Sequence, residues 1–246
     1  MDHTKHLKTF EVIEFRRYTI KEGERDHFAR YFESYFPEAF EQLGAIVFGQ
    51  FLERKNPSLF TWIRGFKDVE ARATVNAAFY DGPLWGEHAS TMNDRLLDHT
   101  NVLLLKPLRP DRGIAVPPPV DPIREPDGAR GLAIAQIFTV VPNGLDSFVE
   151  QAEAVFARYR ATGIREAGVL VTLDVPNNFP RLPFRTGGPY LVWLGIVKDE
   201  QMWKTQLKPL TEHSMDSLTA TGFLRTEPEL VVLDPSRRSR LRWLPD

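Results

Sequence analysis

Three alternating polar residues, Glu14, Arg16 and Tyr18, form the first candidate site. The β-branched and aromatic residues around them predict a strand over 10–20, and alternate residues of a strand share one face. If that face lines a closed cavity, the Arg–Glu pair could hold a carboxylate or an enolate, with Tyr18 as proton donor or orienting group. The competing interpretation is a structural ion pair at the exposed edge of the strand.

Histidines offer a second kind of chemistry, because imidazole titrates near neutral pH and serves as acid, base or metal ligand. His88 and His213 each follow a glutamate on a predicted helix, and both could face one cavity. Neighbouring helix residues lie about 100° apart, which disfavours a Glu–His dyad within one helix; the alternative is a capping or surface histidine. Tyr80 and Trp85, on either side of 81–83, could wall a cavity around His88 or fill a helix kink.

Other aromatic and basic side chains could complete such a site. Trp62 and Arg64 share one face of a strand predicted over 59–66, where Trp62 could equally be a core residue. Arg181 and Arg185 lie in a long proline-containing loop, from which they could steer an anion to a cavity mouth. Alternatively, these two arginines tie the loop to carbonyls and surface carboxylates.

Composition excludes or disfavours several chemistries. The chain has no cysteine, which excludes disulfides, thiolate metal sites and cysteine nucleophiles. Its six histidines, among them His3 and His6, show no HxH or HExxH spacing. No G-x-G-x-x-G follows a strand, and no G-x-S-x-G occurs. We therefore expect no metal site and no cofactor, and haem ligation through His88 or His213 is disfavoured.

The overall composition, 42% hydrophobic and 26% charged, is that of a globular protein. Lys and Arg total 31 against 33 Asp and Glu, so no net field favours nucleic acid. No apolar run approaches the roughly 18 residues of a membrane span, and residues 1–6 lack the apolar segment of a secretory signal. We expect a cytoplasmic protein without nucleic-acid or membrane partners.

The candidate residues must be held by strands and helices, which the apolar periodicity predicts. In the first half, strands are expected over 10–20, 45–54, 59–66 and 102–105, with helices over 28–43 and over 69–98, interrupted at 81–83. In the second half, strands are expected over 132–141, 169–175, 190–197 and 230–233, with helices around 148–159 and over 200–221. Each half follows the order βαββαβ. The long loop 176–189 replaces the short turn 56–58.

The two halves look like copies of one unit. Five short matches recur in the same order at offsets between 120 and 131, among them Tyr18-Thr19 with Phe138-Thr139 and Trp62 with Trp193. In the second copy, the places of Glu14, Arg16 and Tyr18 are taken by Ile134, Gln136 and Phe138. If these faces line a shared cavity, the second copy has lost most of the polar groups that the first retains.

A proline-rich segment separates the copies. Seven of the 19 prolines lie between Pro107 and Pro126, which excludes a helix interior or a central strand there. We predict a first repeat over 1–107, a linker over 108–131, and a second repeat with a C-terminal arm over 132–246. The linker could be an ordered surface arm or a mobile tether.

This order of elements predicts an α+β fold of two tandem ferredoxin-like repeats. A βαββαβ unit forms a four-stranded antiparallel sheet with both helices on one face, which leaves the other face bare and apolar. Two such sheets in one chain can cover their bare faces by stacking face to face. The expected result is a barrel-like interior with helices outside.

Several motifs resemble the NIPSNAP family of the dimeric α/β-barrel superfamily. They are Glu14-x-Arg16-x-Tyr18-Thr19, Trp62, Asp81-Gly82-Pro83-x-Trp85 before a helix with His88, the segment 177–185, and the ending Pro235-Ser236-x-Arg238-Ser239-x-Leu241-Arg242. The resemblance implies tandem ferredoxin-like domains whose biochemical role is mostly unassigned. Related barrels include cofactor-free monooxygenases, cyclases, isomerases and haem-binding enzymes, but fold analogy does not transfer a reaction.

Two hypotheses about function follow. The first is a small anionic or aromatic molecule bound in the barrel cavity, with cofactor-free monooxygenase-, isomerase- or cyclase-type chemistry. Its candidate catalytic residues are His88, Tyr18 and Arg16, and its candidate ligand-binding residues are Glu14, Trp62, Arg64, Tyr80, Trp85, Gln136, His213, Arg181 and Arg185. The alternative is a non-enzymatic interaction or structural module, which predicts a barrel filled by aromatics and an exposed apolar patch. The chain is expected to be a monomer with an internal pseudo-dimer or a homo-oligomer.

Overall fold

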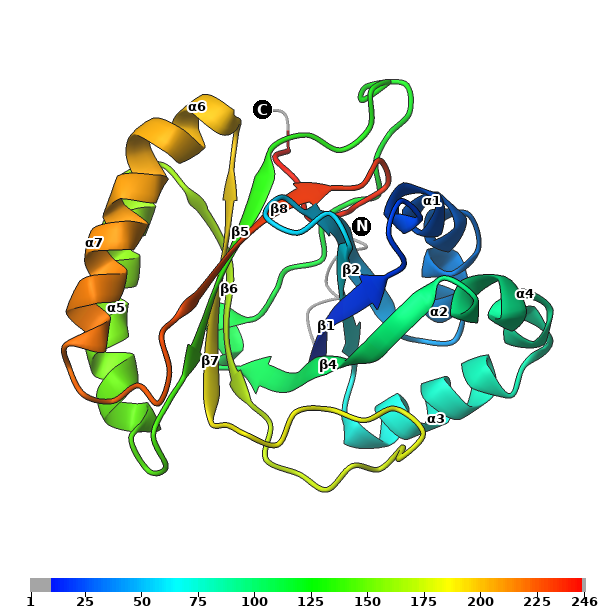
Figure 1. The fold of residues 1–246 in the computed structure, drawn as a ribbon, viewed down its shortest axis with the longest axis horizontal. Coiled ribbons are helices and arrows are strands. Elements are labelled where there is room, and N and C mark those ends of the chain that lie inside the picture. The colour runs from blue at the N-terminus through cyan, green and yellow to red at the C-terminus, as the bar shows by residue number, and fades with distance from the viewer. Residues whose placement is uncertain (1–9, 245–246) are drawn as a thin grey trace, which may run out of the picture.

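The computed structural model describes residues 10–244, and it contains two antiparallel sheets, each with its own helix layer (Figure 1). Residues 1–9 lie outside the described range. They include His3 and His6 and the segment from which we expect no secretory signal. The first half contains β1 Val12–Ile20, α1 Arg25–Tyr35, α2 Pro37–Gln42, β2 Ile46–Glu53, β3 Leu59–Phe66, α3 Val69–Tyr80, α4 Pro83–Asn93 and β4 Leu96–Pro107. The second half contains β5 Leu132–Thr139, α5 Leu145–Ala161, β6 Arg165–Thr172, β7 Tyr190–Val197, α6 Glu200–Met202, a π-helical turn Trp203–Leu207, α7 Lys208–Thr219 and β8 Glu229–Pro235.

Local sequence accounts for most of these boundaries. The Asp68 side chain accepts a hydrogen bond from the Ala71 amide at 2.7 Å and begins α3. Proline begins both α2 and α4, and the start of α4 agrees with the expected interruption at 81–83. The expected helix to residue 98 was wrong, because α4 ends at Asn93 and β4 begins at Leu96. Residues 96–98 are in a strand because β4 pairs with β1, and their own sequence shows no clear apolar period.

The two sheets join at both edges into one closed eight-stranded barrel, in the order β1-β3-β2-β8-β5-β7-β6-β4. The joining pairs, β2 with β8 and β4 with β6, are antiparallel. The predicted tandem α+β architecture is thus confirmed, with a continuous hydrogen-bonded barrel where we expected two stacked sheets. Helices α1–α4 cover the first sheet, and α5 and α7 cover the second on the opposite side (Figure 1).

Strand pairing supports the duplication at single-residue resolution. In the first sheet Glu14 lies opposite Arg64, and Arg16 lies opposite Trp62. In the second sheet the equivalent pairs are Ile134 with Gly195 and Gln136 with Trp193. The two copies therefore share one register, and their side chains can be compared position by position.

Apolar side chains from both sheets fill the barrel interior. The cluster contains Ile13, Phe15, Ile46, Phe48, Phe51, Ile63, Leu103, Leu105, Ile114, Ala133, Ala135, Ile137, Leu170, Tyr190, Val192, Leu194, Ile196, Val231, Leu233 and Leu241. These residues are at most 7% exposed. The space between the sheets is thus a packed core, but most of its side chains are aliphatic, whereas the alternative hypothesis expected aromatic filling.

The segment between β4 and β5 has one short 3₁₀ helix, Pro110–Arg112, and no other helix or strand. Arginines of the C-terminal segment hold it: Arg242 forms an ion pair with Glu125, and Arg240 donates to the Pro117 carbonyl while pairing with Glu41. Arg240 and Arg242 therefore contact carboxylates and carbonyls of their own chain. Among residues 10–244, no helix combines the length and apolarity needed to cross a bilayer.

Candidate functional site

The polar face of β1 lies under the helices and outside the barrel. Val12 and Tyr18 pack with residues of α1, whereas Ile13 and Phe15 belong to the barrel core. Because side chains alternate along a strand, Glu14 and Arg16 lie on the helix side with Tyr18. The hypothesis that this face lines the inter-sheet cavity is therefore wrong.

Glu14 stands at the centre of a buried charge cluster. Its Oε2 accepts hydrogen bonds from Arg16 Nη1 and Arg64 Nε, and its Oε1 accepts one from Arg72 Nε, each at 2.7 Å. All four side chains are at most 1% exposed. Arg72 comes from α3, so the cluster ties the first sheet to its helix layer.

The electrostatics of this cluster favour full ionisation. Burial opposes the charge of Glu14, but Arg64, Arg16 and Arg72 hold the pKa of this carboxyl well below its usual range. Burial likewise opposes the charge of Arg16, yet Tyr18 and Glu14 raise the pKa of the guanidinium above its ordinary value. Three cations therefore surround one anion.

Several buried atoms of this region have no hydrogen-bond partner among residues 10–244. They are Arg16 Nη2, Arg64 Nη1 and Nη2, Arg72 Nη2, Trp62 Nε1, and both amide atoms of Asn76. Aromatic faces pack against two of the cations, with the Arg16 guanidinium carbon 5.5 Å and that of Arg64 4.9 Å from the Trp62 ring centre. Native interiors satisfy most buried polar groups, so this concentration marks the region as unusual.

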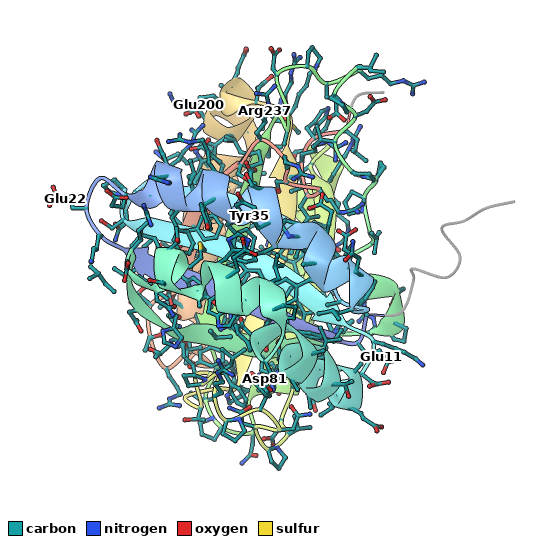
Figure 2. The ribbon with its side chains drawn as sticks, turned by 90° about the vertical axis from the view of Figure 1, so that its right-hand side faces the viewer. Glu11, Glu22, Tyr35, Asp81, Glu200 and Arg237 are labelled. Carbon is teal, nitrogen blue, oxygen red and sulfur yellow. The ribbon has the colours of Figure 1, made fainter. Side chains whose placement is uncertain are left out.

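A cavity of about 450 Å³ lies next to the cluster, between the first sheet and helices α1–α4. It is lined by Tyr18, Phe28, Phe32, Phe36, Phe40, Trp62, Phe79, Tyr80, Trp85, Met92, Asn93, Leu96, Leu97, His99, Arg181 and Leu182. The walls are mainly aromatic. Figure 2 views this helix layer from outside, with Tyr35 of α1 and Asp81 at the turn between α3 and α4 labelled.

Tyr18 connects the cavity to the charge cluster. Its hydroxyl accepts a hydrogen bond from Arg16 Nε at 2.8 Å, which leaves the hydroxyl proton available to donate. Burial raises the pKa of Tyr18 despite the nearby Arg16 charge, so the phenol stays protonated. The His99 ring meets Tyr18 edge-on at 6.4 Å, and burial together with Arg16 lowers the pKa of His99. The cavity thus has a protonated phenol beside a neutral imidazole, which suits proton transfer.

The second repeat supplies part of the cavity wall. The loop between β6 and β7 crosses to the first helix layer, where it runs beside α3 (Figure 1). Arg181 forms an ion pair with Asp81 at 2.9 Å and lies over the Tyr80 ring. Asn178 Oδ1 accepts a hydrogen bond from Arg72 Nη1 at 2.7 Å. One residue, Arg72, therefore contacts both the buried cluster and the loop that covers it.

The other predicted residues lie in varied places. Tyr80, Trp85 and Trp62 line this cavity on the helix side of the sheet, whereas the prediction placed them in the barrel cavity, with Tyr80 and Trp85 around His88. His88 is buried outside the cavity lining, with Nδ1 2.7 Å from the Tyr31 hydroxyl. His213 is exposed on α7, so the two histidines do not share a cavity.

Two further predicted residues have structural contacts elsewhere. Arg185 faces Glu229 at 3.5 Å and lies over the Tyr190 ring, away from the residues that line the cavity. Gln136 is buried and donates to the Tyr159 hydroxyl of α5. Neither residue joins the cluster around Glu14.

Sequence reasoning missed Arg72, Asn76 and His99. Arg72 and Asn76 are four residues apart on α3, and both are buried on the face that also carries Val75 and Phe79. A polar pair inside an apolar helix stripe was the available signal. No comparable signal in the sequence marked His99, because the strand that carries it is formed by pairing with β1.

Within the described part of the chain, no three His, Cys, Asp or Glu side chains are grouped so that they could hold a metal ion. The expectation that the protein needs no cofactor stays a prediction. What the described residues do assemble is a largely aromatic cavity with a hydroxyl, an imidazole and a guanidinium among its lining groups.

Comparison with solved structures identifies the fold class. A proposed monooxygenase from Lactobacillus acidophilus is 12% identical and has a TM-score of 0.55, with 92% of this chain and 94% of that chain covered. An anthrone oxidase-like protein is 10% identical with a TM-score of 0.53, covering 96% and 97%. A proposed chlorite dismutase is 11% identical with a TM-score of 0.51, covering 94% and 97%. At these identities the likeness concerns the fold alone.

The protein is thus a dimeric α/β barrel whose two halves are joined in one chain. The NIPSNAP family model matches residues 13–110, which span nearly all of its first repeat. The resemblance seen in the sequence is therefore confirmed. No curated protein matches the chain.

Proposed function

We propose that this protein binds a small, largely aromatic molecule between the first sheet and helices α1–α4. The observation that carries the proposal is the cavity of about 450 Å³, which is walled by aromatic rings and also lined by a few polar groups, including Tyr18, His99 and Arg181. Ligand sites in proteins typically have this size and this mixture of many apolar and few polar groups. We first expected the site in the barrel interior, and the proposed site lies instead on the helix side of the same sheet.

The loop between β6 and β7, which covers part of the cavity, supports a ligand site of this kind. Loops of this length inside compact domains are commonly functional. Here the loop adds Arg181 and Leu182 to the cavity wall, and both come from the same chain as the rest of the lining. A single chain therefore suffices to build the site, whatever the oligomeric state.

Proton transfer is the chemistry that these groups support by themselves. Tyr18 can donate a proton and neutral His99 can accept one, so isomerase- or cyclase-type reactions through an enol fit the cavity without a cofactor. A cytoplasmic location and the absence of nucleic-acid partners remain predictions.

The alternative, an interaction module, has less support. The described large apolar residues that are exposed are Tyr35, Leu43, Leu97 and Ile123, which lie on four separate segments. The filled barrel fits either hypothesis, since the ligand cavity lies outside it.

Fluorescence titration with N-phenyl-1-naphthylamine, an uncharged aromatic probe, tests the proposal. We expect saturable binding to the wild type and its loss in Leu96→Trp, which places an indole at the cavity wall. Ile123→Trp adds the same bulk at a residue that is 89% exposed and should bind like the wild type. Absence of wild-type binding, or equal binding by Leu96→Trp at unchanged melting temperature, would contradict the proposed function.

A further inference from the structure

The charge balance behind the cavity points to the chemical class of the ligand. Arg16, Arg64 and Arg72 are buried, and among residues 10–244 Glu14 is the one carboxylate with which they form ion pairs. Arginine stays protonated inside proteins, so the cluster carries a net charge of about +2. A buried excess of charge is costly unless an opposite charge lies nearby.

The cavity offers space for a negative charge close to these arginines. Tyr18, Phe40 and Trp62 line the cavity, and the guanidinium groups of Arg16 and Arg64 pack against these same rings at 4.9–5.5 Å. The cations therefore lie directly behind the aromatic wall, where little water screens them. An anion in the cavity would be attracted by both.

Tyr18 offers a direct contact for that anion. Arg16 Nε donates to the Tyr18 oxygen at 2.8 Å, which polarises the hydroxyl and strengthens it as a donor. Its proton is not committed to Arg16, because the guanidinium accepts no hydrogen bond. The cavity wall adjacent to Tyr18 also contains His99, whose ring packs edge-on against the phenol.

The same position in the second repeat lacks all of these features. Phe138 replaces Tyr18, Gln136 replaces Arg16, and Gly195 replaces Arg64. The Gln136 amide nitrogen is already bonded to Tyr159. The positive cluster is therefore specific to the repeat that holds the cavity and is not a general requirement of the fold.

We propose that the ligand is an aromatic acid, whose acidic oxygen accepts a hydrogen bond from the Tyr18 hydroxyl while Arg16 and Arg64 balance its charge from behind the aromatic wall. This inference rests on the proposed function and adds the charge of the ligand. Carboxylate, phenolate and sulfonate oxygens share the chemistry that would be recognised.

Two probes that differ by one sulfonate separate the charge from the aromatic surface. The probes are 1-anilinonaphthalene-8-sulfonate and its uncharged parent, N-phenyl-1-naphthylamine. We expect the wild type to bind the sulfonate about tenfold more tightly, as a charge-assisted hydrogen bond in a buried site allows. Equal or weaker binding of the sulfonate would overturn the inference, while binding of the uncharged probe would leave the proposed function standing. Failure of both probes would contradict the proposed function and this inference with it.

Variants assign the preference to the cluster. Arg16→Met leaves Glu14 with two arginines, and Tyr18→Phe introduces the residue type of the second repeat. Each should reduce the preference for the sulfonate about tenfold and change the affinity for the uncharged probe by less than about twofold. The matched control, Gln136→Met, alters the equivalent position of the second repeat and should keep the preference. An unchanged preference in folded Arg16→Met and Tyr18→Phe would also overturn the inference.

Discussion

The two repeats share a strand register but pack their helix layers in different ways. In the first repeat, Arg64 lies opposite Glu14, and a charged cluster borders a cavity. In the second, Gly195 takes the place of Arg64, and the ring of Trp193 fills the space above it, 2.2 Å from where a Cβ would lie. A few exchanges on two strands thus separate a hollow layer from a filled one.

The two helix layers also differ in whether their buried polar atoms have hydrogen-bond partners. Trp193 donates its indole hydrogen to Glu166 at 3.0 Å, and Gln136 donates to Tyr159. In the first repeat, Trp62 Nε1 and several guanidinium nitrogens have no hydrogen-bond partner within the described part of the chain. The indole donor of the second repeat is thus satisfied, although Gln136 Oε1 has no partner among the described residues, and the first repeat keeps several unsatisfied donors where the ligand is proposed to bind. Such local violations are expected at functional sites.

Removal of the central carboxylate should have the largest effect. Glu14→Gln leaves three buried guanidinium groups without a counter-charge, so we expect the free energy of unfolding to fall by about 3–5 kcal/mol. Denaturant unfolding measures this loss. The control is Ile134→Val at the equivalent position, which should cost about 0.5–1.5 kcal/mol. Losses of similar size in the two variants would contradict the asymmetry between the repeats.

A methyl group at Gly195 should test whether the second layer is filled. Because its Cβ would meet the buried Trp193 ring, Gly195→Ala is expected to lower the free energy of unfolding by about 1–3 kcal/mol. Gly86 lies on α4 with no atom within 4 Å of an added Cβ. Gly86→Ala should therefore leave stability unchanged or raise it by about 0.5–1 kcal/mol. A neutral Gly195→Ala would show that the second layer has room.

The acid limb of the stability curve should depend on Glu14. The pKa of this carboxyl is lowered from 4.5 in the folded state, so below about pH 4.5 the unfolded state binds more protons. Its stabilising contribution is present above that pH and decreases as pH falls towards the folded pKa. Glu14→Gln should flatten the slope of unfolding free energy against pH, by up to about 1.4 kcal/mol per pH unit. An identical slope in the variant and the wild type would contradict the ionised cluster.

The two equivalent tryptophans should respond differently to the same substitution. Trp193→Phe breaks a hydrogen bond to Glu166, whereas Trp62→Phe breaks none. We expect the loss of unfolding free energy at Trp193 to exceed that at Trp62 by about 1 kcal/mol. Thermal and denaturant unfolding of both variants give the comparison, and a larger loss at Trp62 would reverse it.

The sequence alone predicted the duplication and nearly all of the elements, because these depend on local periodicity and turn residues. It did not predict the joined barrel edges, since pairing of β2 with β8 and of β4 with β6 is set by contacts between distant segments. The tandem arrangement could nevertheless be predicted, because each sheet leaves one apolar face that the other sheet can cover.

The candidate site was predicted in part. Alternation along β1 correctly grouped Glu14, Arg16 and Tyr18, but both faces of this strand are buried, so the pattern could not decide which one faces the barrel. His88 was selected for its chemistry and for the repeated Glu-His pair, and it lies outside the cavity lining. The position of Arg72 in an apolar stripe of α3 signals its burial, but its partner Glu14 is set by tertiary packing between distant segments.

A crystal structure with 1-anilinonaphthalene-8-sulfonate bound would test the central claim most directly, because it locates the ligand as well as detecting it. The account predicts the naphthalene ring between the first sheet and helices α1–α4, with a sulfonate oxygen within hydrogen-bond distance of the Tyr18 hydroxyl. Probe density beneath α5 or inside the barrel, with the first-repeat cavity empty, would contradict it.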